Sequence, residues 1–256
     1  MSHDTSATTD PTDGRGSIVR MAVAVRRRRK VNARPGRKLL RFDRAFESRW
    51  VAGADEAGRG SLAGPLVTAA VLLDHDRLRG HACTPLGLLD DSKRRTPEVR
   101  ERLFDAVLKC AERVAVIVIP APTIDQRGLH KSNLAGLAQA LDRLCCPPGT
   151  VLLTDGFRVP LAREHRAVVD GDAKSAAIAA ASIVAKVTRD RLMHREHERY
   201  PLYGFDEHVG YITPRHKAAV RRHGPCPLHR RSFVSLAYTQ LTLVPDELLD
   251  AGDAAG

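Results

Sequence analysis

The chain has 256 residues, 43% of them hydrophobic, which is the size and composition of a globular protein with one substantial core. It contains no run of about 18 to 20 apolar residues, and its polar, acidic start does not resemble a signal peptide. These features argue against a membrane protein, and we expect a soluble cytoplasmic one. The five cysteines lack the spacing of zinc ligands, so zinc is not expected.

The net charge of +11 is unevenly distributed. Residues 1–46 hold 12 Lys and Arg against 4 Asp and Glu, whereas the remaining 210 residues hold 29 against 26. Because apolar residues do not recur with any period in residues 1–46, we predict a disordered basic arm there, a folded domain over 47–245 and a flexible tail over 246–256. The arm either favours binding to polyanions or is a solvated tail that aids solubility.

The first predicted elements form a hairpin. Residues 50–54 (WVAGA) predict a strand that leads into Asp55, and residues 65–73 (PLVTAAVLL) predict a second, buried strand after a glycine-rich turn. Next, Thr96 as N-cap and Pro97 in the first turn predict a helix that ends at about residue 113.

The later elements alternate. Residues 114–119 predict a third strand, 131–144 a helix, 150–156 a fourth strand and 165–172 a short fifth strand. A helix of about seven turns, rich in small residues in its first half, is predicted over 173–200, where Gly and Pro are absent. Short helices follow from about residue 200. This order predicts an α/β protein with a mixed sheet flanked by helices.

Four acidic residues lie at predicted strand ends. Asp55 and Glu56 end the first strand, Asp155 ends the fourth, and Asp172 lies just past the fifth. If the first and fourth strands are neighbours, these carboxylates meet at one edge, and divalent cations would offset their repulsion. Oxygen ligands favour Mg²⁺ or Mn²⁺, and two such ions about 3.5 to 4 Å apart would support phosphodiester cleavage. The alternative is that each acid is ordinary: a turn residue, an N-cap or part of a surface pair.

Three glycines follow the first acid pair: Gly58, Gly60 and Gly64. They remove side chains where a polymer backbone could lie. They do not form a P-loop, since no G-K-[ST] follows, and the dinucleotide-binding G-x-G-x-x-G spacing also fails. A simple tight turn is the alternative interpretation.

Residues 53–65 (GADEAGRGSLAGP) resemble the opening signature of the bacterial ribonuclease HII family, which usually reads D-E-A-G-R-G-P-L-A-G-P. Further stretches resemble that family in the same order between Val51 and Phe233: LLDDSKRRT, LLTDGF, GDAKSAAIAAASIVAKVTRD, YGFDEHVGYITPRH and HRRSF. The chain departs from the family pattern at Ser61, Asp170, Val209 and Ile212. Asp170 adds negative charge near Asp172, which affects metal affinity rather than the presence of the cluster.

The resemblance implies a ribonuclease H-like fold with a five-stranded mixed sheet and a C-terminal helical portion. It implies a monomeric endoribonuclease that uses two Mn²⁺ or Mg²⁺ ions. Such an enzyme hydrolyses the RNA strand of RNA–DNA hybrids and incises duplex DNA 5′ to embedded ribonucleotides, giving 5′-phosphate and 3′-hydroxyl ends in ribonucleotide repair.

The resemblance also implies roles for individual residues. The metal-binding and catalytic residues would be Asp55, Glu56, Asp155 and Asp172. The 2′-hydroxyl of the ribonucleotide would be read by Gly58, Arg59 and Gly60, and Tyr211 would pack on the next sugar. Phosphate contacts would come from Lys93, Ser182 and Lys186.

Two other functions are left open. A non-catalytic nucleic-acid-binding protein would be expected to have lost at least one of the four acids, and all four are present. A DNA nuclease or resolvase of the same broad fold would have no use for the Gly-Arg-Gly stretch or Tyr211, because DNA lacks the 2′-hydroxyl that they read.

Overall fold

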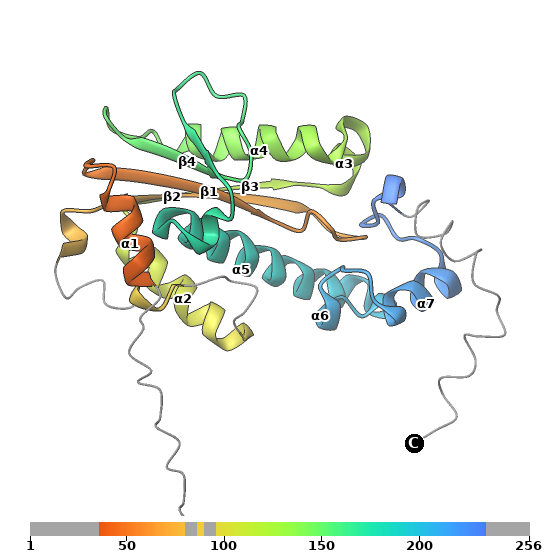
Figure 1. Ribbon diagram of the computed structural model, residues 1–256. Helices are drawn as coiled ribbons and strands as arrows, with labels where there is room; N and C mark the ends of the chain where they lie inside the picture. The colour runs from red at the N-terminus through yellow and green to blue at the C-terminus, as the bar shows by residue number, and fades with distance from the viewer. Residues whose placement is uncertain (1–35, 80–85, 90–95, 234–256) are drawn as a thin grey trace, which may run out of the picture. The chain divides into compact units, whose positions relative to one another are not determined.

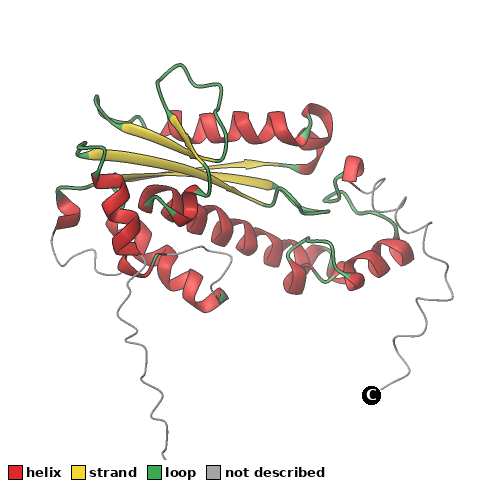
Figure 2. Cartoon of the chain, viewed as in Figure 1, coloured by secondary structure: helices red, strands yellow, loops and turns green. Residues whose placement is uncertain are grey.

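The computed structural model describes residues 36–79, 86–89 and 96–233, all within one compact unit (Arg34–Gly256). Its centre is a five-stranded mixed sheet with the strand order β3-β2-β1-β4-β5. The strands are β1 (Trp50–Ala57), β2 (Leu66–Asp74), β3 (Arg113–Ile119), β4 (Val151–Asp155) and β5 (Arg166–Val168). Helices cover both faces of the sheet (Figure 2), so the predicted α/β architecture is confirmed.

The helices are arranged in two layers. Figure 1 shows α3 and α4 on one face of the sheet, and α1, α2 and α5 on the other. Their bounds are α1 Gly36–Arg44, α2 Pro97–Cys110, α3 Ala121–Arg127, α4 Leu129–Arg143, α5 Ala176–Arg199, α6 Phe205–His208 and α7 Pro214–His223. None of the helices in the described ranges is long and apolar enough to cross a membrane.

Strand pairing confirms the predicted hairpin and the predicted neighbours. β1 and β2 are antiparallel, with Trp50 opposite Asp74 and Ala57 opposite Val67. β1 and β4 are parallel and pair from Val51 with Val151 onward. The first and fourth strands are therefore adjacent, as the hypothesis of a shared acidic edge requires.

Every residue of β2 is buried, and its side chains alternate between two hydrophobic cores. Val67, Ala69 and Val71 belong to the core against α5, whereas Ala70 and Leu72 belong to the core against α4. The continuous apolar run that predicted this strand is thus explained by helices on both sides.

Small residues bring α5 close to the sheet. The predicted helix over 173–200 is confirmed as α5, and Ser175 caps it by accepting a hydrogen bond from the Ile178 amide. The helix backbone approaches so closely that a Cβ on Gly53 of β1 would lie 2.2 Å from the Ile178 nitrogen. Gly53 is therefore required for this contact.

Helix α1 departs from the sequence prediction. Residues 36–44 were assigned to the disordered arm, but they form a helix with Leu39, Leu40 and Asp43 buried. The Asp43 carboxylate accepts a hydrogen bond of 2.9 Å from the Ala177 amide at the start of α5. This contact spans 134 residues of sequence, which local composition cannot reveal. The rest of the predicted arm, residues 1–35, and the predicted tail lie outside the described residues.

Other differences are local. Helix α2 ends at Cys110 rather than near residue 113, because Arg113 already begins β3. The short helix α3 was not predicted. The predicted C-terminal helical portion consists of α6 and α7 after a 3₁₀ helix, η5 (Pro201–Tyr203).

We expect Gly53→Ala to lower the free energy of unfolding by about 3 kcal/mol, because the added methyl group would force α5 away from β1. Urea denaturation followed by circular dichroism measures this. Gly60→Ala is the matched control, since a Cβ at Gly60 would meet nothing within 4 Å. Equal stability of the two variants would contradict the close approach.

Candidate active site at the ends of β1 and β4

Asp55 and Asp155 lie side by side at the carboxyl ends of two parallel strands. The pairing of β1 with β4 runs through Ala54 and Thr154, so the next residue on each strand is one of these acids. Burial raises the pKa of Asp55 well above its usual value, and the charges of Glu56 and Asp155 raise it further. A hydrogen bond with Ser182 of α5 opposes this shift.

Glu56 points to the other face of the sheet, because neighbouring strand positions alternate. It pairs with Thr68, beside α4, while Asp55 pairs with Ala69 in the core against α5. Burial raises the pKa of Glu56, with Arg59 and Asn133 opposing the rise. Its Oε1 lies 3.4 Å from Arg59 Nη1, and its buried Oε2 has no hydrogen-bond partner among the described residues.

Asp172 is held beside Asp155 by a short turn. It lies in the 3₁₀ helix η4 (Gly171–Ala173) between β5 and α5, and it is buried. The Gly171 amide donates a 2.7 Å hydrogen bond to Asp155 Oδ1. A Cβ on Gly171 would lie 2.6 Å from Ile178 Cδ1 and 3.0 Å from Asp155 Oδ1, so the turn packs closely against both side chains.

The acids are of the type that binds a divalent cation, but they are not arranged as a complete metal site. Among the residues that the structure describes, no three His, Cys, Asp or Glu side chains are grouped so as to hold a metal ion. The donors are all carboxylate oxygens, which Mg²⁺ and Mn²⁺ prefer. Burial and mutual repulsion raise the pKa of Asp55, burial raises that of Glu56 despite Arg59, and Glu56 Oε2 accepts no hydrogen bond among the described residues, so a cation would stabilise the charged forms. The residues therefore fit such an ion.

Two buried arginines hold the loop between β1 and β2. Arg189 of α5 and Arg230 are fully buried, and neither forms an ion pair within the described ranges. Both donate to loop carbonyls instead: Arg189 Nε to Pro65 (3.0 Å), Arg189 Nη2 to Ala63 (3.1 Å), Arg230 Nε to Gly64 (3.1 Å) and Arg230 Nη1 to Arg59 (3.0 Å). Sequence analysis missed both, because no local pattern marks an arginine as buried.

The loop leaves no room for side chains near these arginines. Gly58 has a φ of +92°, which favours glycine, and a Cβ there would lie 2.1 Å from Arg189 Nε. Gly60 is exposed and open, in contrast. Arg59 lies with its guanidinium 4.8 Å from the centre of the Phe157 ring. The loop is thus fixed at its base and accessible at its tip.

Tyr211 lies near the loop, half-buried, with two cations of α5 close to its ring. Lys186 Nζ and Arg189 Cζ are each 5.2 Å from the centre of its ring. Lys186 also forms a 2.7 Å ion pair with Asp190. Of the other two predicted phosphate contacts, Ser182 is buried against Asp55, and Lys93 lies outside the described residues.

The departures from the family pattern have different structural settings. Ser61 is fully buried, and its hydroxyl has no hydrogen-bond partner in the part of the chain that the structure describes. Asp170 is exposed, with a φ of +51° that Asp tolerates. Val209 has a φ of +43°, a strained value for a β-branched residue, and its carbonyl accepts a hydrogen bond from Arg189. Nothing in the structure explains the choice of serine at position 61.

The fold and the site together define a ribonuclease H-like protein. The family model for ribonuclease HII matches residues 52–236. Over 209 residues the chain is 48% identical to ribonuclease HII of Acidothermus cellulolyticus, covering 80% of this chain and 66% of that one. Over 188 residues it is 53% identical to ribonuclease HII of Frankia alni, covering 73% and 76%. The chain belongs to the ribonuclease HII family and is, by family, an endoribonuclease of the H type.

Solved structures agree with this assignment. Ribonuclease H2 of Pyrococcus horikoshii is 31% identical, with a TM-score of 0.59 over 72% of this chain and 93% of that one. The ribonuclease HII of Archaeoglobus fulgidus, solved in complex with PCNA, is 28% identical with a TM-score of 0.58, over 71% and 93%. A ribonuclease HIII solved with Mn²⁺ shares the fold at 20% identity and a TM-score of 0.58, over 73% and 69%. The ribonuclease H-like fold is therefore confirmed.

We expect Asp55→Asn to raise the free energy of unfolding at pH 8. A carboxyl whose pKa is raised on folding binds its proton more tightly in the folded state, so its ionisation costs stability as pH rises above the unfolded value of 3.8. The advantage of the variant should shrink as the pH falls towards that value. Denaturant titrations at several pH values measure this difference.

Asp74→Asn is the control with the opposite sign. The hydrogen bond from Arg49 lowers the pKa of Asp74, so its charge stabilises the fold above pH 3.8 and that stability is lost in acid. This variant should be less stable than the wild type at pH 8. If Asp55→Asn also destabilises the protein there, the cost assigned to burial and repulsion of the Asp55 charge is wrong.

Proposed function

We propose that the protein is a metal-dependent endoribonuclease that hydrolyses the RNA strand of RNA–DNA hybrids. It also incises duplex DNA 5′ to embedded ribonucleotides, leaving 5′-phosphate and 3′-hydroxyl ends, and so begins ribonucleotide repair. The observation that carries the proposal is the parallel register that sets Asp55 beside Asp155. We take the enzyme to be a cytoplasmic monomer.

Four carboxylates would hold the metal ions: Asp55, Glu56, Asp155 and Asp172. Bound Mg²⁺ or Mn²⁺ would supply a water of lowered pKa and positive charge beside the leaving oxygen. The chain's own contribution is to hold the carboxylates in place. Ser182 bonds Asp55, and the Gly171 amide bonds Asp155, so neither side chain needs to be ordered when substrate arrives.

The loop supports selection of a ribonucleotide. The Arg59 carbonyl is bound by Arg230, while the amides of Arg59 and Gly60 form no hydrogen bond among the residues described. These amides are therefore free to meet the 2′-hydroxyl, the group that distinguishes RNA from DNA. Tyr211, whose ring has Lys186 and Arg189 close by, would pack on the neighbouring sugar.

The test is a DNA duplex that contains one ribonucleotide. With Mg²⁺ or Mn²⁺ we expect one incision, on the 5′ side of the ribonucleotide, and no cleavage of the matching all-DNA duplex or in the presence of a chelator. Asp55→Asn should lower kcat by at least about 10²-fold while binding is largely kept, since it removes a metal ligand. Gel mapping of the ends identifies the cleaved bond.

Absence of cleavage with either ion by the folded wild-type protein would overturn the proposal. Equal cleavage of the all-DNA duplex would favour a DNA nuclease instead. Binding of the chimeric duplex without cleavage would favour a non-catalytic binding protein.

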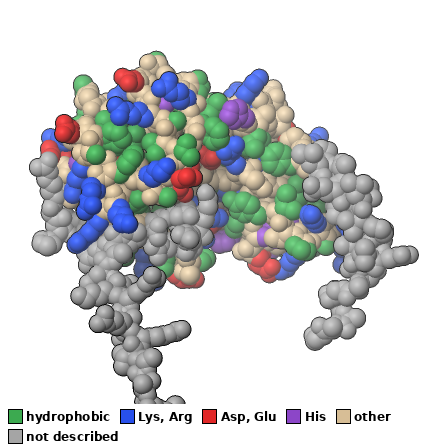
Figure 3. Space-filling view, viewed as in Figure 1, with side chains coloured by type: hydrophobic (Ala, Val, Ile, Leu, Met, Phe, Trp, Pro, Cys, Tyr) green, Lys and Arg blue, Asp and Glu red, His purple; other side chains and the backbone are tan. Residues whose placement is uncertain are grey.

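The basic arm is proposed to strengthen binding to the duplex. Lys and Arg side chains are spread over much of the face in Figure 3, yet residues 47–256 carry only a small positive excess. Residues 1–33 add 7 Lys and Arg against 3 Asp and Glu. Deleting 1–33 leaves α1 in place and should weaken duplex binding and reduce its salt dependence, because fewer counterions are released.

Duplex affinity measured at several salt concentrations tests the arm. Replacing residues 26–30 (RRRRK) with five glutamines is the matched control, since it keeps the length of the arm and removes five of its seven basic side chains. Both changes should reduce the slope. An unchanged slope would leave the arm as a solubility tail.

A further inference from the structure

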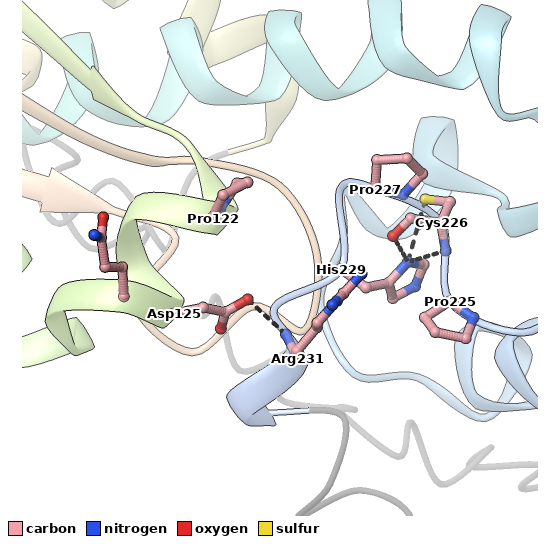
Figure 4. Close-up of a pocket in the computed structure, with 8 residues that line it drawn as sticks. Pro122, Asp125, Pro225, Cys226, Pro227, His229 and Arg231 are labelled. Atoms are coloured by element: carbon pink, nitrogen blue, oxygen red, sulfur yellow. Dashed lines mark hydrogen bonds between the residues drawn. The ribbon is translucent and has the colours of Figure 1, made fainter.

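Two buried histidines connect Tyr211 to the last segment that the structure describes. His216, on α7, places its Nδ1 at 2.9 Å from the Tyr211 carbonyl oxygen. Its Nε2 lies 3.0 Å from Nε2 of His229. His216 is 0% exposed and His229 3% exposed. Figure 4 shows His229 beside a surface pocket, with its bonds to Cys226 drawn.

For neutral rings the hydrogen bonds allow one arrangement of protons. A carbonyl oxygen can only accept, so Nδ1 of His216 carries the hydrogen and its Nε2 is the acceptor. His229 must then donate from Nε2, and its Nδ1 accepts the 3.0 Å bond from the Cys226 amide, so the 3.3 Å approach of this Nδ1 to the Cys226 carbonyl is a contact without a hydrogen. The hydrogen bonds from the Cys226 amide through His229 and His216 to the Tyr211 carbonyl therefore all point in one direction, with both rings neutral.

The surroundings keep the rings neutral. His208 stacks on His216, with 4.3 Å between ring centres and 17° between planes, and is itself bonded at both nitrogens to backbone groups. Burial, with a smaller contribution from the neighbouring His208, lowers the pKa of His216 and of His229 to about 4. The other titratable side chains against the two rings are Tyr203 and Cys226, and no carboxylate pairs with them within the described ranges.

His229 lies on a segment, residues 228–230, that pairs with the loop between β1 and β2. The Gly64 amide donates to the Leu228 carbonyl (2.9 Å) and the Arg230 amide to the Leu62 carbonyl (3.0 Å), so His229 lies opposite Ala63 in a β-bridge. The far end of this segment is also fixed, because Asp125 of α3 accepts a hydrogen bond from the Arg231 amide, as Figure 4 shows. A shift of this segment would therefore move the loop and His229 together.

We propose that His216 and His229 are positioning residues that fix Tyr211 relative to the Gly58–Gly60 loop. In this arrangement the tyrosine ring and the loop are set to meet two neighbouring sugars of the substrate. The inference rests on the proposed function, in which these two elements recognise the ribonucleotide and the next nucleotide.

Substitutions at His216 separate positioning from general stability. Asparagine keeps a donor at the δ position for the Tyr211 carbonyl, whereas leucine removes it. For the duplex with one ribonucleotide, His216→Leu should raise KM, and the Kd measured in chelator, about tenfold, the effect of one lost hydrogen bond. The kcat should stay within about twofold, and His216→Asn should restore most of the affinity. Affinity for the all-DNA duplex should not change.

His165→Leu is the matched control. His165 is also a buried histidine held by backbone groups at both nitrogens, the Val159 amide (3.0 Å) and the Arg163 carbonyl (3.2 Å), but it lies between β4 and β5. Its loss should lower stability and leave KM unchanged. An unchanged KM in folded His216→Leu, or equal KM values for His216→Leu and His216→Asn, would overturn the inference.

The wild-type protein provides a second test that does not depend on the folding of a variant. Nitrogen-15 NMR of the histidine rings should find the hydrogen of His216 on Nδ1 and that of His229 on Nε2, with neither ring titrating between pH 8 and about 5. The opposite tautomers, or titration in that range, would overturn the inference. Failure of the proposed function is distinguishable, because the wild-type enzyme would then not cleave the chimeric duplex.

Discussion

Parallel pairing of β1 with β4 is the contact on which the site depends, because it sets the buried Asp55 beside the partly buried Asp155. Burial raises the pKa of Asp55, and repulsion from Glu56 and Asp155 raises it further, so the arrangement costs stability until a cation offsets it. Two local hydrogen bonds oppose this repulsion: one between Ser182 and Asp55, and one from the Gly171 amide to Asp155. Both partners depend on α5, which reaches the sheet because Gly53 has no side chain. The hydrophobic core therefore holds in place a group of charges that repel one another.

In the proposed function, recognition would rely on backbone groups, and side chains would hold those groups in place. A buried guanidinium without an acidic partner is costly, and two of them, Arg189 and Arg230, lie beneath one loop. Their donors are matched to four loop carbonyls, which fixes the direction of the peptide groups. The chain through His216 does the same for the Tyr211 carbonyl. A backbone held this way can discriminate a 2′-hydroxyl without ordering any side chain on binding.

The strands, and the neighbouring positions of Asp55 and Asp155, could be predicted because their signals are local. The apolar run of β2 and the small residues of α5 each indicate one structure without reference to distant residues. Helix α1 could not be predicted, since it is basic and its burial depends on Asp43 meeting Ala177. The same holds for Arg189, whose burial follows from loop carbonyls more than 120 residues away. Asp55 and Glu56 point to opposite faces of the sheet because side chains alternate along a strand. Noting only that both acids lie at a strand end does not reveal this.

Asp43 also supports the site indirectly, although it lies before the region that the family model matches, which begins at residue 52. Its carboxylate lies at the amino end of α5, where the helix dipole favours negative charge, and it bonds the Ala177 amide. Burial nevertheless raises its pKa to about 6, so desolvation outweighs those bonds and its ionisation costs stability as pH rises from 3.8 to about 6. At neutral pH α1 thus holds an anion against the helix that carries Ser182 to Asp55. A segment outside the matched region therefore shares in positioning the proposed metal ligands.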